Sequence, residues 1–377
     1  MNPEYYARLA EAGLDGQDLP DETCREILRS PDIELLPLLA AAYTIRKRFW
    51  GNDVTVHIIN NAQNGHCPED CHYCAQAKSS QADILEYPLK TDEEIFAEAQ
   101  NAYESGAFRY CMVFAGRGPS KKRVEHLARL VREIKSRYPI EICVSTGLLD
   151  KGKADILKDA GLDRLNHNLN TSEDNYPNIC TTHTYQDRIN TLTAARQAGV
   201  QLCSGLIIGM GEQDTDIIEI AKTLRGLKAE SIPVNFLIPI EGTAITQNAA
   251  LTPDYCLRVL CLFRFLNPSA EIRMAAGREV HLRSMEVLGL YPASSLFLQG
   301  YLNTKGSSRG KTLRMIRDAG FQIRSAQNLD ELIEKEENPE TGEDGLSFPG
   351  MKDIQDLRPY RPQSAERTSS AARDKCC

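Results

Sequence analysis

From residue 54 onward, two hydrophobic patterns alternate along the chain. Short runs rich in β-branched and apolar residues are each followed by a longer segment with apolar residues at helical spacing. The predicted strands cover residues 54–59, 110–114, 141–145, 164–169, 201–208, 233–238, 271–275 and 295–298. The predicted helices cover residues 91–105, 121–137, 150–160, 184–198, 214–228, 253–266, 279–289 and 309–319.

This alternation predicts the α/β class, because strands that alternate with helices form a parallel sheet. Eight strand–helix units over about 265 residues are typical of a (β/α)8 TIM-type barrel. An open, doubly wound sheet is the alternative. It is disfavoured because no Gly-x-Gly-x-x-Gly run follows the first predicted strand.

The two ends of the chain differ from its middle. Residues 1–53 predict helices, one opening at Asp21 after Pro20 and another over about 33–49. We expect them to form an N-terminal helical cap on a barrel of residues 54–325. Residues 326–377 are polar, with an acidic stretch and scattered prolines, so we expect a mostly disordered tail.

Composition narrows the possible functions. The chain has 377 residues, of which 42% are hydrophobic, and a net charge of −8, which argues against nucleic-acid binding. No apolar run approaches the length of a membrane span, and the N-terminus lacks a signal-type segment. We therefore expect a cytoplasmic protein. Its twelve cysteines then favour metal binding or catalysis over disulfides.

A compact cysteine motif follows the first predicted strand. Cys67, Cys71 and Cys74 have the spacing C-x3-C-x2-C, and Tyr73 precedes the last of them. Thiolates are soft ligands that select zinc, copper(I) or iron–sulfur clusters. Active residues of such barrels lie in the loops after the strands, where this motif stands. A structural zinc site is the alternative, but it normally needs a second cysteine pair, and none lies nearby.

Further unusual residues occupy the other predicted strands. Three strands carry one cysteine each and a fourth carries an arginine: Cys111, Cys143, Cys203 and Arg273. A single strand cysteine is usually a small buried hydrophobe, but three in one barrel could meet around a metal centre. Two more strands carry amides and a histidine: Asn166, His167, Asn168, Asn170 and Asn235. Because unpaired buried amides are costly, we expect a polar ligand beside them.

These motifs resemble a known family. The Cys67–Cys74 motif, with its aromatic residue, resembles the signature of the radical S-adenosylmethionine (SAM) superfamily. Together with residues 166–172, 184–188, 275–279 and 300–304, it makes residues 30–325 similar to the biotin synthase family. The resemblance implies a sulfurtransferase that converts dethiobiotin to biotin, using a 5′-deoxyadenosyl radical and sulfide from a second iron–sulfur cluster.

The resemblance also implies a role for individual residues. Cys67, Cys71 and Cys74 would hold a [4Fe-4S] cluster whose open iron binds SAM, and the barrel set Cys111, Cys143, Cys203 and Arg273 would hold a [2Fe-2S] cluster. Contacts to SAM would come from Tyr73, Asn168, Asn170 and Arg188, and contacts to dethiobiotin from Asn166 and Asn235. No side chain would act as an acid or base catalyst. The family further implies a homodimer and an electron donor such as flavodoxin or ferredoxin.

Two residues leave room for other interpretations. Some family members have aspartate where this chain has Asn170, so SAM binding could be weaker here. Arg273 could instead pair with a carboxylate inside the barrel, since a guanidinium stays protonated and offers no lone pair. For the whole chain, the alternatives are a maturase-like radical SAM enzyme of the same subgroup and a non-enzymatic iron–sulfur carrier.

Overall fold

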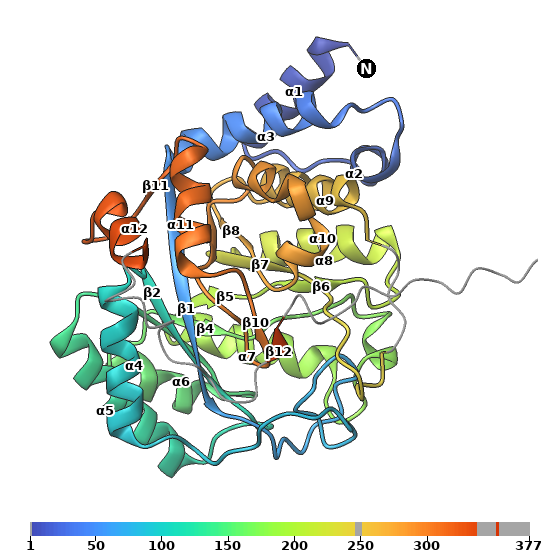
Figure 1. Ribbon diagram of the computed structural model, residues 1–377. Coiled ribbons are helices and arrows are strands. Elements are labelled where there is room, and N and C mark those ends of the chain that lie inside the picture. Colours follow the sequence, from blue (N-terminus) through green and yellow to red (C-terminus); the bar gives the residue numbers. More distant parts are fainter. Residues whose placement is uncertain (1, 246–250, 338–351, 354–377) are drawn as a thin grey trace, which may run out of the picture.

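The core of the protein is a closed barrel of parallel strands (Figure 1). The computed structural model describes residues 2–245, 251–337 and 352–353. The strands are β1 (Asp53–Gln63), β2 (Arg109–Phe114), β3 (Glu141–Ser145), β4 (Arg164–Asn166), β5 (Gln201–Cys203) continued by β6 (Leu206–Ile208), β7 (Ser231–Phe236), β8 (Glu271–Met274) and β9 (Ser295–Phe297). Each pairs in parallel with its neighbour, and β9 pairs with β1 to close the barrel. The predicted (β/α)8 barrel is confirmed, and the open sheet is excluded.

Helices surround the barrel between the strands. They are α4 (Asp92–Glu104), α5 (Lys121–Arg137), α6 (Lys151–Asp159), α7 (Tyr185–Gln197), α8 (Asp214–Gly226), α9 (Pro253–Leu266) and α11 (Arg309–Asp318). Side-chain caps define where they begin. Thr91, Ser120 and Asp150, for example, each accept a hydrogen bond from a backbone N–H of the first helical turn.

Two predicted elements are interrupted in the structure. The strand expected over 201–208 breaks between β5 and β6, because Gly205 passes so close to β7 that a Cβ would lie 1.9 Å from the Pro233 carbonyl oxygen. The helix expected over 279–289 divides into α10 (Arg278–His281) and a 3-10 helix, η2 (Arg283–Leu290). The division falls at Arg283, whose φ of +53° is left-handed.

The predicted N-terminal cap consists of three helices, α1 (Pro3–Leu14), α2 (Asp21–Arg29) and α3 (Leu35–Trp50). They pack against α8 and α9, on the side of the barrel where the strands begin (Figure 1). Arg258 of α9 donates hydrogen bonds to the backbone carbonyls of Ile27 and Ile33, so the cap is fixed by polar contacts as well as by its apolar core. The opposite end of the barrel is left for the loops that follow the strands.

The prediction of a disordered tail from residue 326 is wrong for its first part. Helix α12 (Leu329–Glu337) packs on α11, with Leu332 and Ile333 buried, and Glu336 pairs with Arg309 at 3.1 Å. The spacing of these apolar residues was a helix signal that the acidic composition obscured. Residues 352–353 form β12, which pairs with β10 (Thr304–Lys305). The rest of the predicted tail lies outside the described residues.

A short strand, β11 (Gln322–Ile323), pairs with the start of β1. Within the described parts of the chain, no helix combines the length and apolar character that crossing a membrane requires.

Candidate active site and metal centres

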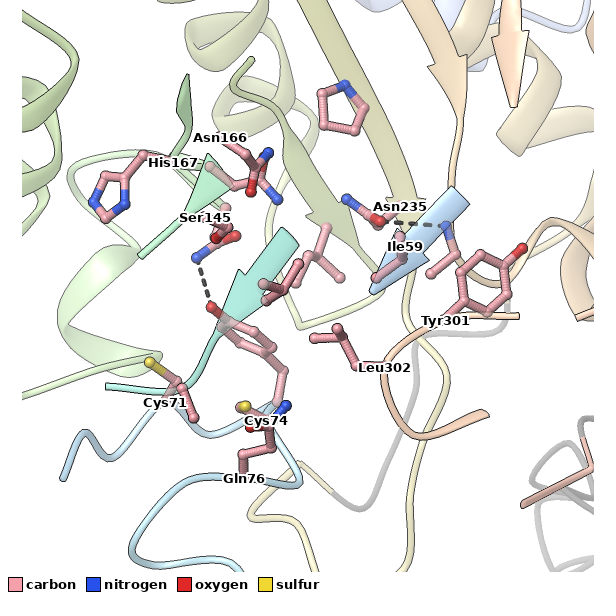
Figure 2. A pocket seen from close by; sticks show the side chains of 18 of the residues that line it. Ile59, Cys71, Cys74, Gln76, Ser145, Asn166, His167, Asn235, Tyr301 and Leu302 are labelled. Carbon is pink, nitrogen blue, oxygen red and sulfur yellow. Dashed lines mark hydrogen bonds between the residues drawn. The ribbon is translucent and has the colours of Figure 1, made fainter. Parts of the chain in front are cut away.

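A cavity of about 390 Å³ lies at the ends of the strands, within the size range of small-molecule sites. It is lined by every residue to which the sequence analysis gave a site role: Cys67, Cys71, Tyr73, Cys74, Cys111, Cys143, Asn166, Asn168, Asn170, Arg188, Cys203, Asn235 and Arg273. Figure 2 shows Cys71 and Cys74 on one side of this cavity and Asn166 and Asn235 on the other. Residues more than 200 positions apart in the sequence therefore share one space.

The cysteine motif lies in a folded loop after β1. The backbone N–H of Cys74 donates to the Cys71 carbonyl at 3.0 Å, which turns the loop between the two thiols. Asp70 fastens this loop to a second one, because its Oδ1 accepts hydrogen bonds from the backbone N–H groups of Thr181 and Thr182 at 2.9 and 3.1 Å. The three thiols are thus held at the cavity wall by backbone geometry.

The protonation of these thiols suits a site that is completed by a metal. Burial raises the pKa of Cys67, and it raises that of Cys74 to about 11. For Cys71, a hydrogen bond with Cys180 and then burial raise the pKa further. In the metal-free protein the three are therefore neutral thiols, and metal binding would release their protons. Three soft donors on one loop fit a cluster that keeps one iron open.

A second set of thiols lies deeper in the barrel. Cys111 and Cys143 are direct partners in the pairing of β2 with β3, and Cys203 stands opposite Asn166 across β4 and β5. All three cysteines are buried, and the Arg273 Nη1 lies 3.7 Å from the Cys203 sulfur. A hydrogen bond from Cys143, followed by the charge of Arg273, holds the pKa of Cys203 well below its ordinary value despite burial. Such an electropositive thiol group fits a buried metal centre.

Arg273 also makes the ion pair that the alternative interpretation required. Its Nη2 lies 2.5 Å from the Glu271 Oε1 and 2.9 Å from the Ser231 Oγ, while its Nε has no hydrogen-bond partner among the described residues. One side of the guanidinium thus binds a carboxylate while Nη1 faces the Cys203 thiol. The two proposed roles of Arg273 therefore occupy different parts of one side chain and do not exclude each other.

Glu271 is the centre of this buried charge network. Burial by itself would raise the pKa of its carboxyl, but Arg109, then His57 and Arg273, hold the pKa well below its usual range. Burial, followed by the charge of Arg273, lowers the pKa of His57, so that residue is neutral. The fully buried carboxylate therefore stays charged and fixes Arg273.

The amides near β4 are better satisfied than the sequence suggested. The Asn168 Oδ1 accepts hydrogen bonds from the Asn166 Nδ2 at 3.2 Å and from the Gly205 N–H at 3.1 Å. Asn235 donates to the Leu206 carbonyl at 2.9 Å and accepts from the Ala276 N–H at 3.2 Å. The break between β5 and β6 thus supplies backbone partners for these amides, and the polar ligand expected beside them stays a prediction. Asn166 also contacts the inner thiols, because its Nδ2 lies 3.4 Å from the Cys203 sulfur.

The residues expected to contact SAM form one connected group. The Asn170 Nδ2 donates to the Tyr73 hydroxyl at 2.7 Å, which ties the cysteine loop to the loop after β4. Asn170 has a φ of +71°, a conformation that asparagine tolerates better than most residues. Arg188 is buried, and its Nη1 donates to the Asn168 carbonyl at 2.6 Å. Asn170 is thus bonded to Tyr73 and Arg188 to Asn168, and all four residues line the same cavity as the two sets of thiols.

Sequence reasoning assigned no individual role to three residues at this site. The buried His167 lines the cavity, and its Nε2 has no hydrogen-bond partner within the described part of the chain, as expected of a group that awaits a ligand. Cys180 lies with its sulfur 3.8 Å from that of Cys71, and His183 is in contact with both Cys180 and Glu69. The only signal was a Cys-x2-His spacing distant from the cysteine motif.

Comparison with known proteins supports the same interpretation. Residues 64–224 match the Radical SAM superfamily, and residues 233–322 match the Biotin and Thiamin Synthesis associated domain. A solved structure of methylornithine synthase superposes with a TM-score of 0.72 at 19% identity, covering 86% of this chain and 98% of the other. The FeFe-hydrogenase maturase HydG from Carboxydothermus hydrogenoformans gives a TM-score of 0.72 at 17% identity, with coverages of 87% and 81%. At these identities, the likeness shows the fold alone.

Curated relatives are much more similar in sequence. The biotin synthase of Magnetococcus marinus is 57% identical over 316 residues, which cover 84% of this chain and 98% of the relative. The biotin synthase of Acaryochloris marina is 55% identical, with coverages of 84% and 91%. The chain therefore belongs to the biotin synthase family, radical SAM enzymes that use a [4Fe-4S] cluster, a second iron–sulfur cluster and SAM to convert dethiobiotin to biotin.

Proposed function

We propose that the cavity is divided into an outer site that generates the radical and an inner site that supplies sulfur. In the outer site, Cys67, Cys71 and Cys74 are the three protein ligands of the [4Fe-4S] cluster. The support is that three thiols of one loop line the cavity and that no other cysteine belongs to that loop. SAM occupies the adjoining space, where Tyr73, Asn168, Asn170 and Arg188 are connected by hydrogen bonds.

The inner site is assigned to the second cluster, of the [2Fe-2S] type. Cys111, Cys143, Cys203 and Arg273 are its proposed ligands. Their support is that Cys111 and Cys143 are paired across β2 and β3, that Cys203 lies on β5 beyond β4, and that the Arg273 Nη1 faces Cys203. Glu271 fixes Arg273 from the far side through a hydrogen bond to its Oε1.

Dethiobiotin is placed between the two sites. The observation that carries this proposal is Asn166, which lines the cavity and also contacts the sulfur of Cys203 at 3.4 Å. A substrate held by Asn166 therefore lies beside the sulfur source. Asn235, fixed by the Leu206 carbonyl and the Ala276 N–H, supplies the second amide.

The protein itself contributes placement and exclusion of water. When bound, the clusters supply an electron that cleaves SAM to methionine and a 5′-deoxyadenosyl radical, and the sulfide that enters the substrate. Around them, Phe297 and Tyr301 close the cavity wall with buried rings. A radical attacks whatever is near, so rigid placement of the substrate decides which carbon reacts. No acid or base side chain is needed.

We further propose the partners that the family resemblance implies. They are a homodimer and an external electron donor such as flavodoxin or ferredoxin, in a cytoplasmic setting. The maturase-like alternative is set aside, because the likeness to a hydrogenase maturase, at 17% identity, concerns the fold alone. The inner set of three cysteines and an arginine favours biotin synthesis, since we do not expect that set in a maturase.

The experiment that tests the substrate site is Asn166→Ala. Losing a hydrogen bond to dethiobiotin should weaken its binding about 3- to 10-fold, because such a bond contributes roughly 1 kcal/mol. Binding is measured by isothermal titration of the reconstituted enzyme with dethiobiotin, and cluster content is measured on the same sample. Asn178→Ala, which changes an exposed amide in the 3-10 helix Tyr176–Asn178, is the control and should bind normally. Equal affinity of Asn166→Ala and the parent would contradict the placement.

A further inference from the structure

A second group of metal-binding side chains adjoins the cysteine motif. The Sγ atoms of Cys71 and Cys180 and a ring nitrogen of His183 all lie within 4.8 Å of one another, and all three residues are buried. Cys180 and His183 come from the loop between η1 (Tyr176–Asn178) and α7, far in sequence from Cys71. Neither has a part in the function proposed above.

The spacing of these atoms fits one tetrahedral ion. With metal–sulfur bonds near 2.3 Å and metal–nitrogen bonds near 2.0–2.1 Å, two thiolates on one ion lie about 3.8 Å apart, and a thiolate and an imidazole nitrogen about 3.5 Å apart. The two sulfurs are separated by 3.8 Å, and the Cys180 sulfur lies 3.3 Å from the His183 Nδ1. Thiolates on different irons of a cubane lie further apart, so Cys180 does not fit as a fourth ligand of the [4Fe-4S] cluster.

The surroundings of His183 allow Nδ1 to act as a ligand. In the metal-free structure, Nε2 lies 2.9 Å from the Arg188 Nη2 and 2.8 Å from the Tyr176 hydroxyl, and because a guanidinium only donates, Nε2 accepts and Nδ1 carries the ring hydrogen. When an ion binds Nδ1, that hydrogen moves to Nε2, where the Tyr176 hydroxyl can accept it. Glu69 already contacts Nδ1 through its Oε2 and is the nearest acidic oxygen for the fourth position. Two thiolates and a carboxylate would carry three negative charges, and the divalent ion would carry two positive charges. The positive charge of Arg188, whose Nη2 lies 2.9 Å from the His183 Nε2, compensates the one negative charge in excess.

We propose that, in the chain without its [4Fe-4S] cluster, Cys71, Cys180 and His183 bind a single thiophilic divalent cation of the zinc or ferrous type. Binding forms two metal–sulfur bonds and one metal–nitrogen bond, and any proton still carried by the Cys71 or Cys180 sulfur is released to solvent, without any change of oxidation state. Because Cys71 is shared, the ion and the cluster exclude each other. This last consequence rests on the proposed role of Cys71 in the cluster, whereas the ion site itself does not.

Cobalt(II) titration of the metal-free full-length protein, without oxygen, tests this site. Two quantities are measured for each variant: the sulfur-to-cobalt charge-transfer absorption and the amount of bound cobalt per chain. Any cobalt bound by the inner thiols Cys111, Cys143 and Cys203 is the same in all variants and therefore does not affect the differences between them. Cys180→Ala and His183→Ala should each lose one bound cobalt and the matching absorption. Cys67→Ala and Cys261→Ala should keep both, because Cys67 belongs only to the cysteine motif and Cys261 is buried in α9.

Two results would overturn the proposal. One is cobalt binding by Cys180→Ala equal to that of the parent. The other is a loss in Cys67→Ala as large as that in Cys180→Ala, which would assign the ion to the three-cysteine motif. Far-ultraviolet circular dichroism and thermal unfolding confirm that each variant is folded, and Cys180→Ser, which keeps the volume of the side chain, replaces Cys180→Ala if that variant does not fold.

A competition experiment separates this proposal from the proposed function. Loading zinc first should slow assembly of the [4Fe-4S] cluster in the parent, and Cys180→Ala should abolish that delay while assembling a full cluster. Equal delays in both proteins would contradict a shared Cys71. If Cys71→Ala instead assembled a normal [4Fe-4S] cluster, the proposed function would fail while the cobalt results for Cys180 and His183 still decided the ion site.

Discussion

At the scale of single residues, the site depends on buried charged groups that are paired with one another. Glu271 is not exposed to solvent, and it binds Arg109, Arg273 and Ser231. A buried ion pair contributes little to the net free energy of folding, but removing one of its two charges leaves the other buried without a counter-charge. The role of Glu271 in this barrel is therefore to hold Arg273 in one orientation.

We expect Glu271→Gln to lower the free energy of unfolding by about 3–5 kcal/mol, because Arg109 and Arg273 would lose their buried counter-charge. The [2Fe-2S] content should fall with it, while the [4Fe-4S] content stays near normal. Chemical denaturation and Mössbauer spectroscopy measure the two effects. Glu141→Gln is the matched control, since Glu141 also pairs with Arg109 but is 30% exposed, and its effect should stay below about 1 kcal/mol.

The contribution of Glu271 would be disproved if Glu271→Gln and Glu141→Gln were equally stable and equally loaded with iron. The sequence could not have predicted this network. It indicated only that Arg273 had two possible partners, a metal or a carboxylate, and the structure provides contacts to a thiol and a carboxylate at once.

At the scale of elements, most strands and helices follow from local signals. The strands begin within two residues of their predicted positions, whereas β1 continues beyond its predicted end at residue 59 to Gln63, and β4 stops at Asn166 instead of residue 169. Capping residues such as Thr91 and Ser120 mark where the intervening helices begin. The exceptions depend on tertiary contacts. The break between β5 and β6 exists because β7 approaches Gly205, and α12 forms because Leu332 and Ile333 find a surface on α11. The contact of Gly205 with β7 and the contact of α12 with α11 cannot be recognised from the sequence near each element.

The break at Gly205 gives a prediction at this scale. Gly205→Ala would place a Cβ 1.9 Å from the Pro233 carbonyl oxygen, so β6 must move. We expect a loss of about 1–3 kcal/mol in stability from overpacking and weaker binding of SAM, since the Gly205 N–H also fixes Asn168. Thermal unfolding and SAM titration measure both.

Gly226→Ala is the control for this substitution. Gly226 ends α8, and an added Cβ there would meet nothing within 4 Å, so the change should be neutral or slightly stabilising. Unchanged stability and SAM affinity in Gly205→Ala would show that the close approach to β7 has no structural consequence.

At the scale of the whole molecule, the helices that stabilise the barrel and the residues proposed to carry out the chemistry lie at opposite ends of it. The cap of α1, α2 and α3 covers the side where the strands begin, and the cysteine loop and the amides gather at the other end (Figure 1, Figure 2). The sequence predicted this division, and every residue to which strand positions and family resemblance gave a site role lines the cavity. It could not predict Cys180 and His183, because their meeting with Cys71 depends on two loops that only the closed barrel brings together.

The central claim is that one barrel holds two separate clusters, and Cys143→Ala tests it most directly. The substitution should cost about 1–2 kcal/mol, which a barrel of this size tolerates. After anaerobic reconstitution, the parent should hold about six iron atoms per chain, and the variant should lose the [2Fe-2S] component of the Mössbauer spectrum while keeping the [4Fe-4S] component. It should still bind and cleave SAM, because Tyr73, Asn170 and Arg188 are unchanged, yet it should form little or no biotin. Parental biotin yield with an unaltered spectrum would contradict the account, because Cys143 would then be no more than a buried core residue.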